Sequence, residues 1–189
     1  MEIGLLFGSF NPIHMGHLII ANAVLNELPL SKIWFIVSPQ NPLKKNSALL
    51  HADKRLMLVE KAIESDQRFS TSDVEFNLPV PSYTINTLMH LEKKYPENKF
   101  YLIMGSDSFL DLKKWKNYET LLRKNIIVYE RPGFIMSKTS FSSNIISLKS
   151  PLLDISATEI RTLIKAGKSI RYLVPENIIL IIENQLLYK

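Results

Sequence analysis

The residues best suited to chemistry lie near the start of the chain, between Gly8 and His17. His14 and His17 stand three positions apart, so their side chains point the same way if this segment is helical. Gly8 and Gly16 carry no Cβ, which leaves the backbone open to close approach by a ligand. A helix N-terminus attracts anions through its free N–H groups and its dipole. The segment therefore predicts a phosphate-binding site.

This segment must be held between a strand and a helix. An apolar run at 3–7 leads into it, and an apolar-periodic stretch at 18–28 follows it. A second apolar run at 33–37 completes a strand–helix–strand unit, which is expected to be parallel and right-handed. Similar patterns predict strands at 69–76, 100–104, 126–129 and 145–148, helices at 53–65, 84–94, 155–166 and 175–187, and a short helix within 115–123.

Alternating strands and helices predict a three-layer, Rossmann-like α/β fold with a mainly parallel sheet. Polar segments at 8–17, 38–45 and 105–107 follow predicted strands, and we expect them to be loops that gather at one edge of the sheet. Neither a repeat nor a linker interrupts the chain. We therefore expect a single domain over 1–189, with the C-terminal helices from about 156 packed on it.

Composition limits the class of protein. The net charge of +5 suits an anionic ligand, but the charges are scattered, which argues against nucleic acid as a partner. The sequence has no cysteine, which excludes disulfides and thiolate chemistry and fits a reducing compartment. Its apolar runs are shorter than the roughly 20 residues that cross a bilayer, and its N-terminus does not resemble a signal peptide. We expect a cytoplasmic protein without a membrane partner.

Two motifs resemble the signatures of the nucleotidyltransferase superfamily. The first is Gly8-x-Phe10-x-Pro12-x-His14-x-Gly16-His17. The second, Ile155 to Arg161, resembles the pattern Ile-Ser-Ser/Ala-Thr-x-Ile-Arg and lies in the expected order along the chain. Ser156 is also a good helix N-cap, with Glu159 three residues on as in a capping box, and this structural role is compatible with a binding role.

Within the superfamily, the chain is most similar to the bacterial nicotinate-nucleotide adenylyltransferases. The supporting residues are Ser82-Tyr83-Thr84, Gly105-Ser106-Asp107, Trp115 and Glu130-Arg131-Pro132-Gly133. One departure from the family pattern occurs at 42–44, where Pro-Leu-Lys replaces the usual Pro-His-Lys. Leu43 therefore leaves the substrate role of that position open, while Lys44 still matches.

The resemblance implies transfer of AMP from ATP to nicotinate mononucleotide, which gives deamido-NAD and pyrophosphate. It implies Mg²⁺ bound mainly through the ATP phosphates, since no His/Asp/Glu cluster in the sequence suggests a metal site made by protein alone. The implied catalytic residues are His14, His17 and Arg161. The implied ATP-binding residues are Gly8, Ser9, Phe10, His14, His17, Gly105, Asp107, Ser156, Thr158 and Arg161. The implied acceptor-binding residues are Lys44, Ser82, Tyr83, Thr84, Trp115 and Arg131.

Each assignment has a structural alternative. Trp115 can stack on a flat pyridine ring or belong to the core, although its charged neighbours make full burial unfavourable. Ser82 and Thr84 can bind a carboxylate or cap a helix, and Lys44 can pair with a phosphate or remain in solvent. Asp107 can hydrogen-bond the ATP ribose.

Three other functions stay open. The first is an adenylyl- or cytidylyltransferase of the same superfamily that acts on nicotinamide mononucleotide or 4′-phosphopantetheine. The second is a nucleotide-binding regulatory module without catalysis, and the third is a nucleic-acid binder. The sequence leaves open the preference for nicotinate over nicotinamide, the closure of loops on substrate, and whether copies of the chain form a homo-oligomer.

Overall fold

The structure is a computed structural model that describes residues 1–40, 49–134 and 143–189. Its sheet is built from β1 (Glu2–Gly8), β2 (Lys32–Val37), β3 (Phe69–Ser72), β4 (Lys99–Gly105), β5 (Asn125–Tyr129) and β6 (Ile145–Leu148). The helices are α1 (Met15–Glu27), α2 (Ala52–Ile63), α3 (Thr84–Lys94), α4 (Ser106–Leu110), α5 (Tyr118–Leu121), α6 (Ala157–Lys165) and α7 (Glu176–Asn184), with 3₁₀ turns η1 (Val74–Asn77) and η2 (Leu112–Lys114).

The six strands form one sheet in the order β3-β2-β1-β4-β5-β6, and every neighbouring pair is parallel. The chain builds outward from β1 to β3, returns beside β1 as β4, and builds outward again on the other side. The order of strands therefore reverses between β1 and β4, which is where open α/β sheets bind ligands. The predicted α/β fold with a mainly parallel sheet is confirmed.

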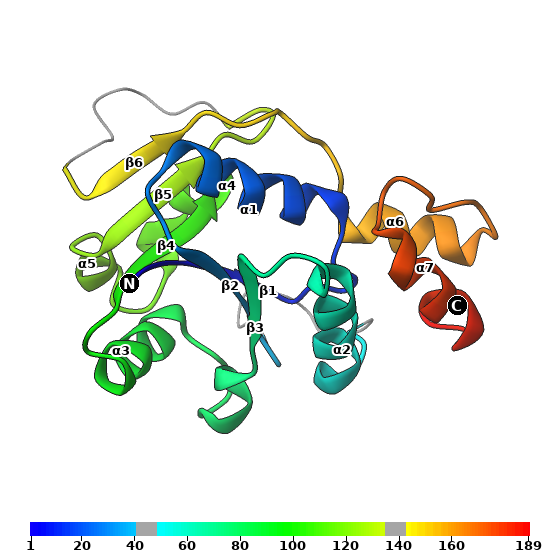
Figure 1. The fold of residues 1–189 in the computed structure, drawn as a ribbon, viewed down its shortest axis with the longest axis horizontal. Helices are drawn as coiled ribbons and strands as arrows, with labels where there is room; N and C mark the ends of the chain where they lie inside the picture. The colour runs from blue at the N-terminus through cyan, green and yellow to red at the C-terminus, as the bar shows by residue number, and fades with distance from the viewer. Residues whose placement is uncertain (41–48, 135–142) are drawn as a thin grey trace.

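Apolar side chains cover both faces of the sheet because successive strand residues point to opposite faces. Leu6 and Phe35 face one cluster, which α1, α2, α6 and α7 cover. Leu5 and Leu102 face the other, which α3, η2 and α5 cover. Figure 1 shows α1 on one side of the sheet and α3 on the other.

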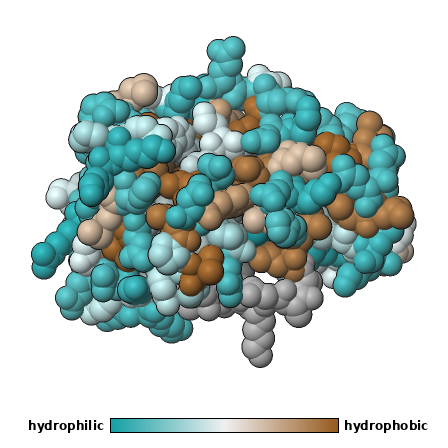
Figure 2. All heavy atoms as spheres, turned by 90° about the horizontal axis from the view of Figure 1, so that it is seen from below, coloured by the Kyte–Doolittle hydropathy of each residue, from teal (hydrophilic) through white to brown (hydrophobic). Residues whose placement is uncertain are grey.

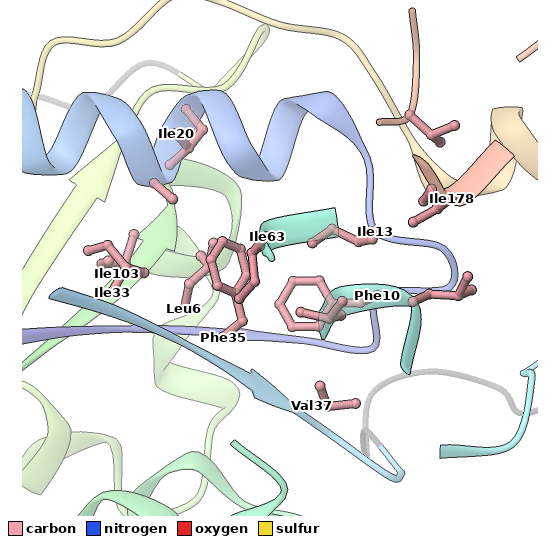
Figure 3. Packing of buried hydrophobic residues seen from close by; sticks show 14 of the residues in the cluster. Leu6, Phe10, Ile13, Ile20, Ile33, Phe35, Val37, Ile63, Ile103 and Ile178 are labelled. Atoms are coloured by element: carbon pink, nitrogen blue, oxygen red, sulfur yellow. The ribbon is translucent and has the colours of Figure 1, made fainter. Parts of the chain in front are cut away.

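The C-terminal helices α6 and α7 lie together beyond the N-terminal end of α1 (Figure 1). They contribute Ile160, Ile178 and Ile182 to the cluster that contains Leu6, and Figure 3 shows Ile178 at the border of this cluster. The backbone N–H of Met15 also donates to the carbonyl of Leu173 at 2.8 Å. These contacts support the prediction of one domain, which stays a prediction.

In the described part of the chain, no helix is long and apolar enough to cross a membrane.

Two predicted segments differ from the structure. The strand expected at 69–76 ends at Ser72, because the chain turns into η1, where the N–H of Phe76 donates to the carbonyl of Asp73 at 2.8 Å. The loop expected at 105–107 does not exist, since β4 ends at Gly105 and α4 begins at Ser106. A strand therefore passes directly into a helix there, with Asp107 in the first turn, where the helix dipole favours a carboxylate.

Candidate active site

A cavity of about 510 Å³ opens at the carboxyl edge of the sheet, where the order of strands reverses between β1 and β4. Four parts of the chain supply most of its lining. They are the segment after β1, the start of α4, the segment after β5 and the start of α6. The residues include Gly8, Ser9, Phe10, Asn11, His14, Gly16, His17, Asp107, Tyr129, Arg131, Ile155, Ser156, Thr158 and Arg161. Most residues predicted to bind ATP therefore lie around one cavity.

The segment after β1 is fixed by its own aromatic side chain. Phe10 has a φ of 44°, in the left-handed region, and its buried ring folds back over Gly8. A Cβ on Gly8 would lie 2.8 Å from that ring, so only glycine fits there. The ring also packs on Phe35 with centroids 5.7 Å apart, and Figure 3 shows both side chains within the core. Burial of Phe10 thus anchors the segment to the sheet.

The two histidines form a stacked pair at the N-terminus of α1. His14 is the N-cap residue and is buried, and its ring lies 3.7 Å from the ring of His17, centroid to centroid. The backbone N–H of His14 donates to Nδ1 of His17 at 3.3 Å. A neutral His17 whose Nδ1 accepts carries its proton on Nε2, so it presents an N–H donor at its other nitrogen. The helix begins at Met15, later than Pro12, and so the segment from Gly8 to Ile13 is not helical.

The second motif opens α6 as predicted. Ser156 is the N-cap, and its hydroxyl accepts a hydrogen bond from the backbone N–H of Glu159 at 3.1 Å. Arg161, one turn along, donates to the backbone carbonyl of Asn11 at 2.7 Å and to the hydroxyl of Thr158 at 3.2 Å. An arginine of the second motif is therefore hydrogen-bonded to the backbone of the first, across 150 positions of sequence.

Gly105, Asp107 and Arg131 meet at the ends of β4 and β5. A Cβ on Gly105 would lie 2.4 Å from Oδ1 of Asp107 and 2.9 Å from Cδ of Arg131, so the absence of a side chain lets these two approach. The hydroxyl of Ser106 accepts from the backbone N–H of Arg131 at 2.9 Å. Asp107 and Arg131 both line the cavity, although Arg131 was expected to contact the acceptor rather than to share the ATP cavity.

The other described residues expected to bind the acceptor, Ser82, Tyr83, Thr84 and Trp115, lie outside the lining of this cavity. Tyr83 and Trp115 are half-buried against the core cluster on the α3 side of the sheet. Lys116, next to Trp115, places its Nζ 4.5 Å from the centre of the Tyr83 ring. The structure therefore brings the Ser82–Thr84 segment and the Trp115 segment together. Lys44 lies outside the described residues.

The side chain of Ser82, expected to bind the acceptor, is buried. Its hydroxyl has no hydrogen bond of normal geometry in the described structure, and Ser82 does not line the cavity. The residue precedes the N-cap of α3, which is Tyr83, and the helix itself starts at Thr84. A contact between Ser82 and the acceptor stays a prediction.

Sequence reasoning missed Arg55, which is completely buried in α2. Its guanidinium donates to the backbone carbonyls of Ser9 at 2.5 Å, Ser38 at 2.8 Å and Pro39 at 3.1 Å, and its Nε donates to Leu50 at 2.7 Å. Burial lowers the pKa of Arg55 below its usual value. This side chain joins the segments that follow β1 and β2. The available signal was an arginine in a predicted helix near the apolar stripe, which does not reveal its partners.

The residues around the cavity suit a nucleotide phosphate more than a metal ion. In the described ranges, no group of three His, Cys, Asp or Glu side chains is placed to hold a metal. The cavity instead combines two stacked histidines, Arg161 and Arg131 with two helix N-termini. Donors of this kind bind phosphate oxygens. Fold and site together define a nucleotide-binding α/β protein of the nucleotidyltransferase class.

Comparisons with known proteins agree with this class. Residues 5–163 match the model of the cytidylyltransferase-like family. A protein of Cytophaga hutchinsonii, named probable nicotinate-nucleotide adenylyltransferase, is 48% identical over 179 residues, which cover 94% of this chain and 93% of that protein. A protein of Flavobacterium johnsoniae with the same name is 45% identical, and the alignment covers both chains completely.

A solved structure also shares the fold. The nicotinic acid mononucleotide adenylyltransferase of Plasmodium falciparum, complexed with NaAD, superposes with a TM-score of 0.85 over 99% of this chain and 97% of that one, at 22% identity. This chain belongs to the cytidylyltransferase-like family, and within it to the nicotinate-nucleotide adenylyltransferases represented by these relatives.

Proposed function

We propose that this protein transfers the AMP moiety of ATP to nicotinate mononucleotide, giving deamido-NAD and pyrophosphate. The observation that carries the proposal is the hydrogen bond from Arg161 to the carbonyl of Asn11. It joins the two motifs into one wall of a single cavity, beside the stacked histidines. The names of the full-length relatives support the choice of acceptor.

The reaction needs little from the protein except placement and charge. A phosphate oxygen of the mononucleotide attacks the α-phosphorus of ATP and forms a new P–O bond. The bond between the α-phosphorus and the oxygen that bridges it to the β-phosphate breaks, and pyrophosphate leaves. The attacking phosphate is already anionic, so no general base and no covalent intermediate are required. Catalysis then depends on holding the two phosphates in line and on stabilising the charge that develops on their oxygens.

The cavity residues have complementary parts in this step. The Nε2–H of His17 is a fixed donor for an oxygen of the α-phosphate, and His14 holds it in that tautomer through its backbone N–H. Ser156, Thr158 and Arg161 bind the β- and γ-phosphates and then the departing pyrophosphate, at the positive end of α6. Gly8, Ser9 and Phe10 line the same space, while Gly105 and Asp107 are proposed to receive the ribose.

The acceptor is proposed to lie along the α3 side of the site. Trp115 stacks on the pyridine ring, and the backbone N–H groups at the start of α3, around Tyr83 and Thr84, receive its carboxylate. Lys44 and Arg131 are proposed to pair with the acceptor phosphate. An acidic ring substituent suits this site because a helix N-terminus favours an anion over a neutral amide.

Mg²⁺ is proposed to enter with ATP rather than to occupy a protein site. The lining holds the carboxylates Asp107 and Glu130 among several cationic or N–H-donating groups. This donor set fits an ion held mostly by phosphate oxygens and water. When bound, Mg²⁺ supplies charge neutralisation on the phosphates. We also propose a cytoplasmic location, which agrees with the absence of cysteine.

An acceptor panel tests the function. The purified chain is incubated with ATP or CTP and with nicotinate mononucleotide, nicotinamide mononucleotide or 4′-phosphopantetheine, and pyrophosphate and the dinucleotide product are measured. We expect turnover with ATP and nicotinate mononucleotide. Turnover of 4′-phosphopantetheine but not of nicotinate mononucleotide overturns the proposed acceptor, and the absence of pyrophosphate with every pair indicates a module without catalysis.

A further inference from the structure

A buried polar cluster lies beneath the segment proposed to bind the acceptor. Glu75, in η1, is 1% exposed, and the hydroxyl of Thr87 donates to its Oε1 at 2.7 Å. The hydroxyls of Ser38 and Ser82 also face this carboxyl group. Its second oxygen and the Ser82 hydroxyl are nevertheless buried without a hydrogen bond of normal geometry. A carboxyl group removed from water in this way is costly and calls for a reason.

The cluster joins three elements that the site depends on. Ser38 follows β2, and Glu75 lies in the turn after β3. Ser82 lies just before α3, and Thr87 lies in the first turn of α3. Backbone hydrogen bonds run alongside, from the N–H of Ser82 to the carbonyl of Gln40 at 3.2 Å, and from the N–H of Ser38 to the carbonyl of Gly8 at 2.9 Å. The start of α3 is thereby fixed to the end of β2. The end of β2 is in turn fixed to Gly8, where the segment after β1 begins.

The surroundings of Glu75 disfavour its charged form. Burial raises the pKa of the Glu75 carboxyl, and its polar neighbours in the described structure are hydroxyls rather than cations. A protonated carboxyl can accept from one hydroxyl at Oε1 and donate to another at Oε2. The hydrogen bond from Thr87 to Oε1 fixes a direction between η1 and α3 that an apolar contact would not.

We propose that Glu75 is a positioning residue that sets the segment Ser82–Thr84, and with it the acceptor-binding N-terminus of α3, against the end of β2. Ser82 acts within this cluster and does not touch the acceptor. The inference rests on the proposed function, since it concerns the site of the acceptor. It predicts a defect in acceptor binding with little change in ATP binding, because none of Ser38, Glu75, Ser82 and Thr87 lines the ATP cavity.

Steady-state kinetics with each substrate varied in turn test the inference. An unsatisfied buried hydrogen-bonding group costs about 1–3 kcal/mol, so Glu75→Ala is expected to raise KM for the acceptor about 5- to 100-fold. KM for ATP should stay within about twofold, because the interactions with ATP are untouched. Glu75→Gln keeps the shape of the side chain, an oxygen that accepts and a nitrogen that donates. KM for the acceptor should therefore stay close to the wild-type value.

Matched variants separate positioning from a general loss of structure. Glu92→Gln removes a different carboxylate, which lies on α3 and pairs with Lys124 at 2.7 Å, and should leave both KM values unchanged. If Glu75→Ala does not fold, Thr87→Val and Ser82→Ala remove single hydroxyls and must show the same acceptor-selective rise. Thermal unfolding of each variant identifies those that fold.

The outcomes distinguish this inference from the proposed function. Equal rises in both KM values, an unchanged acceptor KM, or no rescue by glutamine overturns the positioning role. A wild-type enzyme that does not use nicotinate mononucleotide overturns the proposed acceptor instead, and the same comparison is then made with the acceptor that the panel identifies. A wild-type protein inactive with every acceptor overturns both.

Discussion

The backbone N–H of His14 donates to Nδ1 of His17 at 3.3 Å, and the two imidazole rings stack with centroids 3.7 Å apart. A residue that caps a helix therefore also fixes the tautomer of the histidine one turn further on. The rings of Phe10 and His17 also pack edge to face, with centroids 5.0 Å apart. His17 is consequently held in one orientation before any ligand arrives, which is the condition for electrostatic catalysis by a fixed donor.

His17→Ala is expected to lower kcat by about 10² or more, since it removes a donor proposed to act on the α-phosphate in the transition state. The measurement is the rate of pyrophosphate release at saturating ATP and acceptor. His90→Ala, a change of an exposed histidine on α3, is the control and should retain full activity. A kcat close to that of the wild type with His17→Ala contradicts the role.

Arg161→Ala is expected to lower kcat/KM for ATP about 10- to 100-fold, because charge-assisted hydrogen bonds to phosphates contribute about 1.5–3 kcal/mol. Arg161→Lys should recover only part of this, since a lysine cannot contact Asn11 and a phosphate with one planar fork. Initial rates at varied ATP measure the effect. Arg171→Ala changes an arginine whose side chain is 62% exposed and is the matched control. Equal losses in the two alanine variants would argue against a phosphate role.

Trp115→Ala is expected to raise KM for the acceptor while kcat changes little, because stacking on the pyridine ring holds the substrate equally in the ground and transition states. Trp115→Phe, which retains an aromatic face, should lie between the alanine variant and the wild type. Both KM values are measured at saturating co-substrate. A rise in KM for ATP instead of the acceptor refutes the assignment.

Arg55→Met is expected to lower the free energy of unfolding by about 3 kcal/mol or more, because it leaves several buried backbone carbonyls without a donor. Urea unfolding measures this change. The control is Arg68→Met, which removes an ion pair with Asp66 whose arginine side chain is 48% exposed, and should cost at most about 1 kcal/mol. Similar decreases in the free energy of unfolding in the two variants would show that the buried hydrogen bonds of Arg55 stabilise the fold no more than an exposed ion pair does.

Glu75 is expected to make stability depend on pH. Burial raises the pKa of Glu75 in the folded state above the ordinary 4.5. At a pH between the unfolded and the folded pKa, the folded state therefore keeps a proton that the unfolded chain has lost. Stability from this group is therefore lost as the pH rises above the ordinary pKa and through the folded one. Glu75→Gln cannot ionise, and its stability relative to wild type should increase from acidic to neutral pH. A pH-independent difference in urea unfolding contradicts this.

Much of the phosphate site followed from local sequence. A strand, two glycines, two histidines and a helix occur within a few turns of chain, so their mutual placement at 8–17 depends mainly on local geometry. The cap at Ser156 is equally local, because its hydroxyl bonds the N–H three residues on. The secondary-structure predictions differ from the structure at 69–76 and 105–107, because a short polar stretch is compatible with a strand, a turn or a helix.

The sequence alone determined the α/β class, the two phosphate motifs and the family, because hydrophobic periodicity and motif spacing depend on residues that are close together in sequence. The tertiary structure decided which distant residues meet. Arg161 reaches Asn11, Arg55 joins the segments after β1 and β2, and Glu75 lies beneath Ser82. These relationships depend on the order of strands and on which buried groups lack other partners, and neither is encoded in a local pattern. A buried arginine or glutamate is recognised only when the fold shows what it bonds.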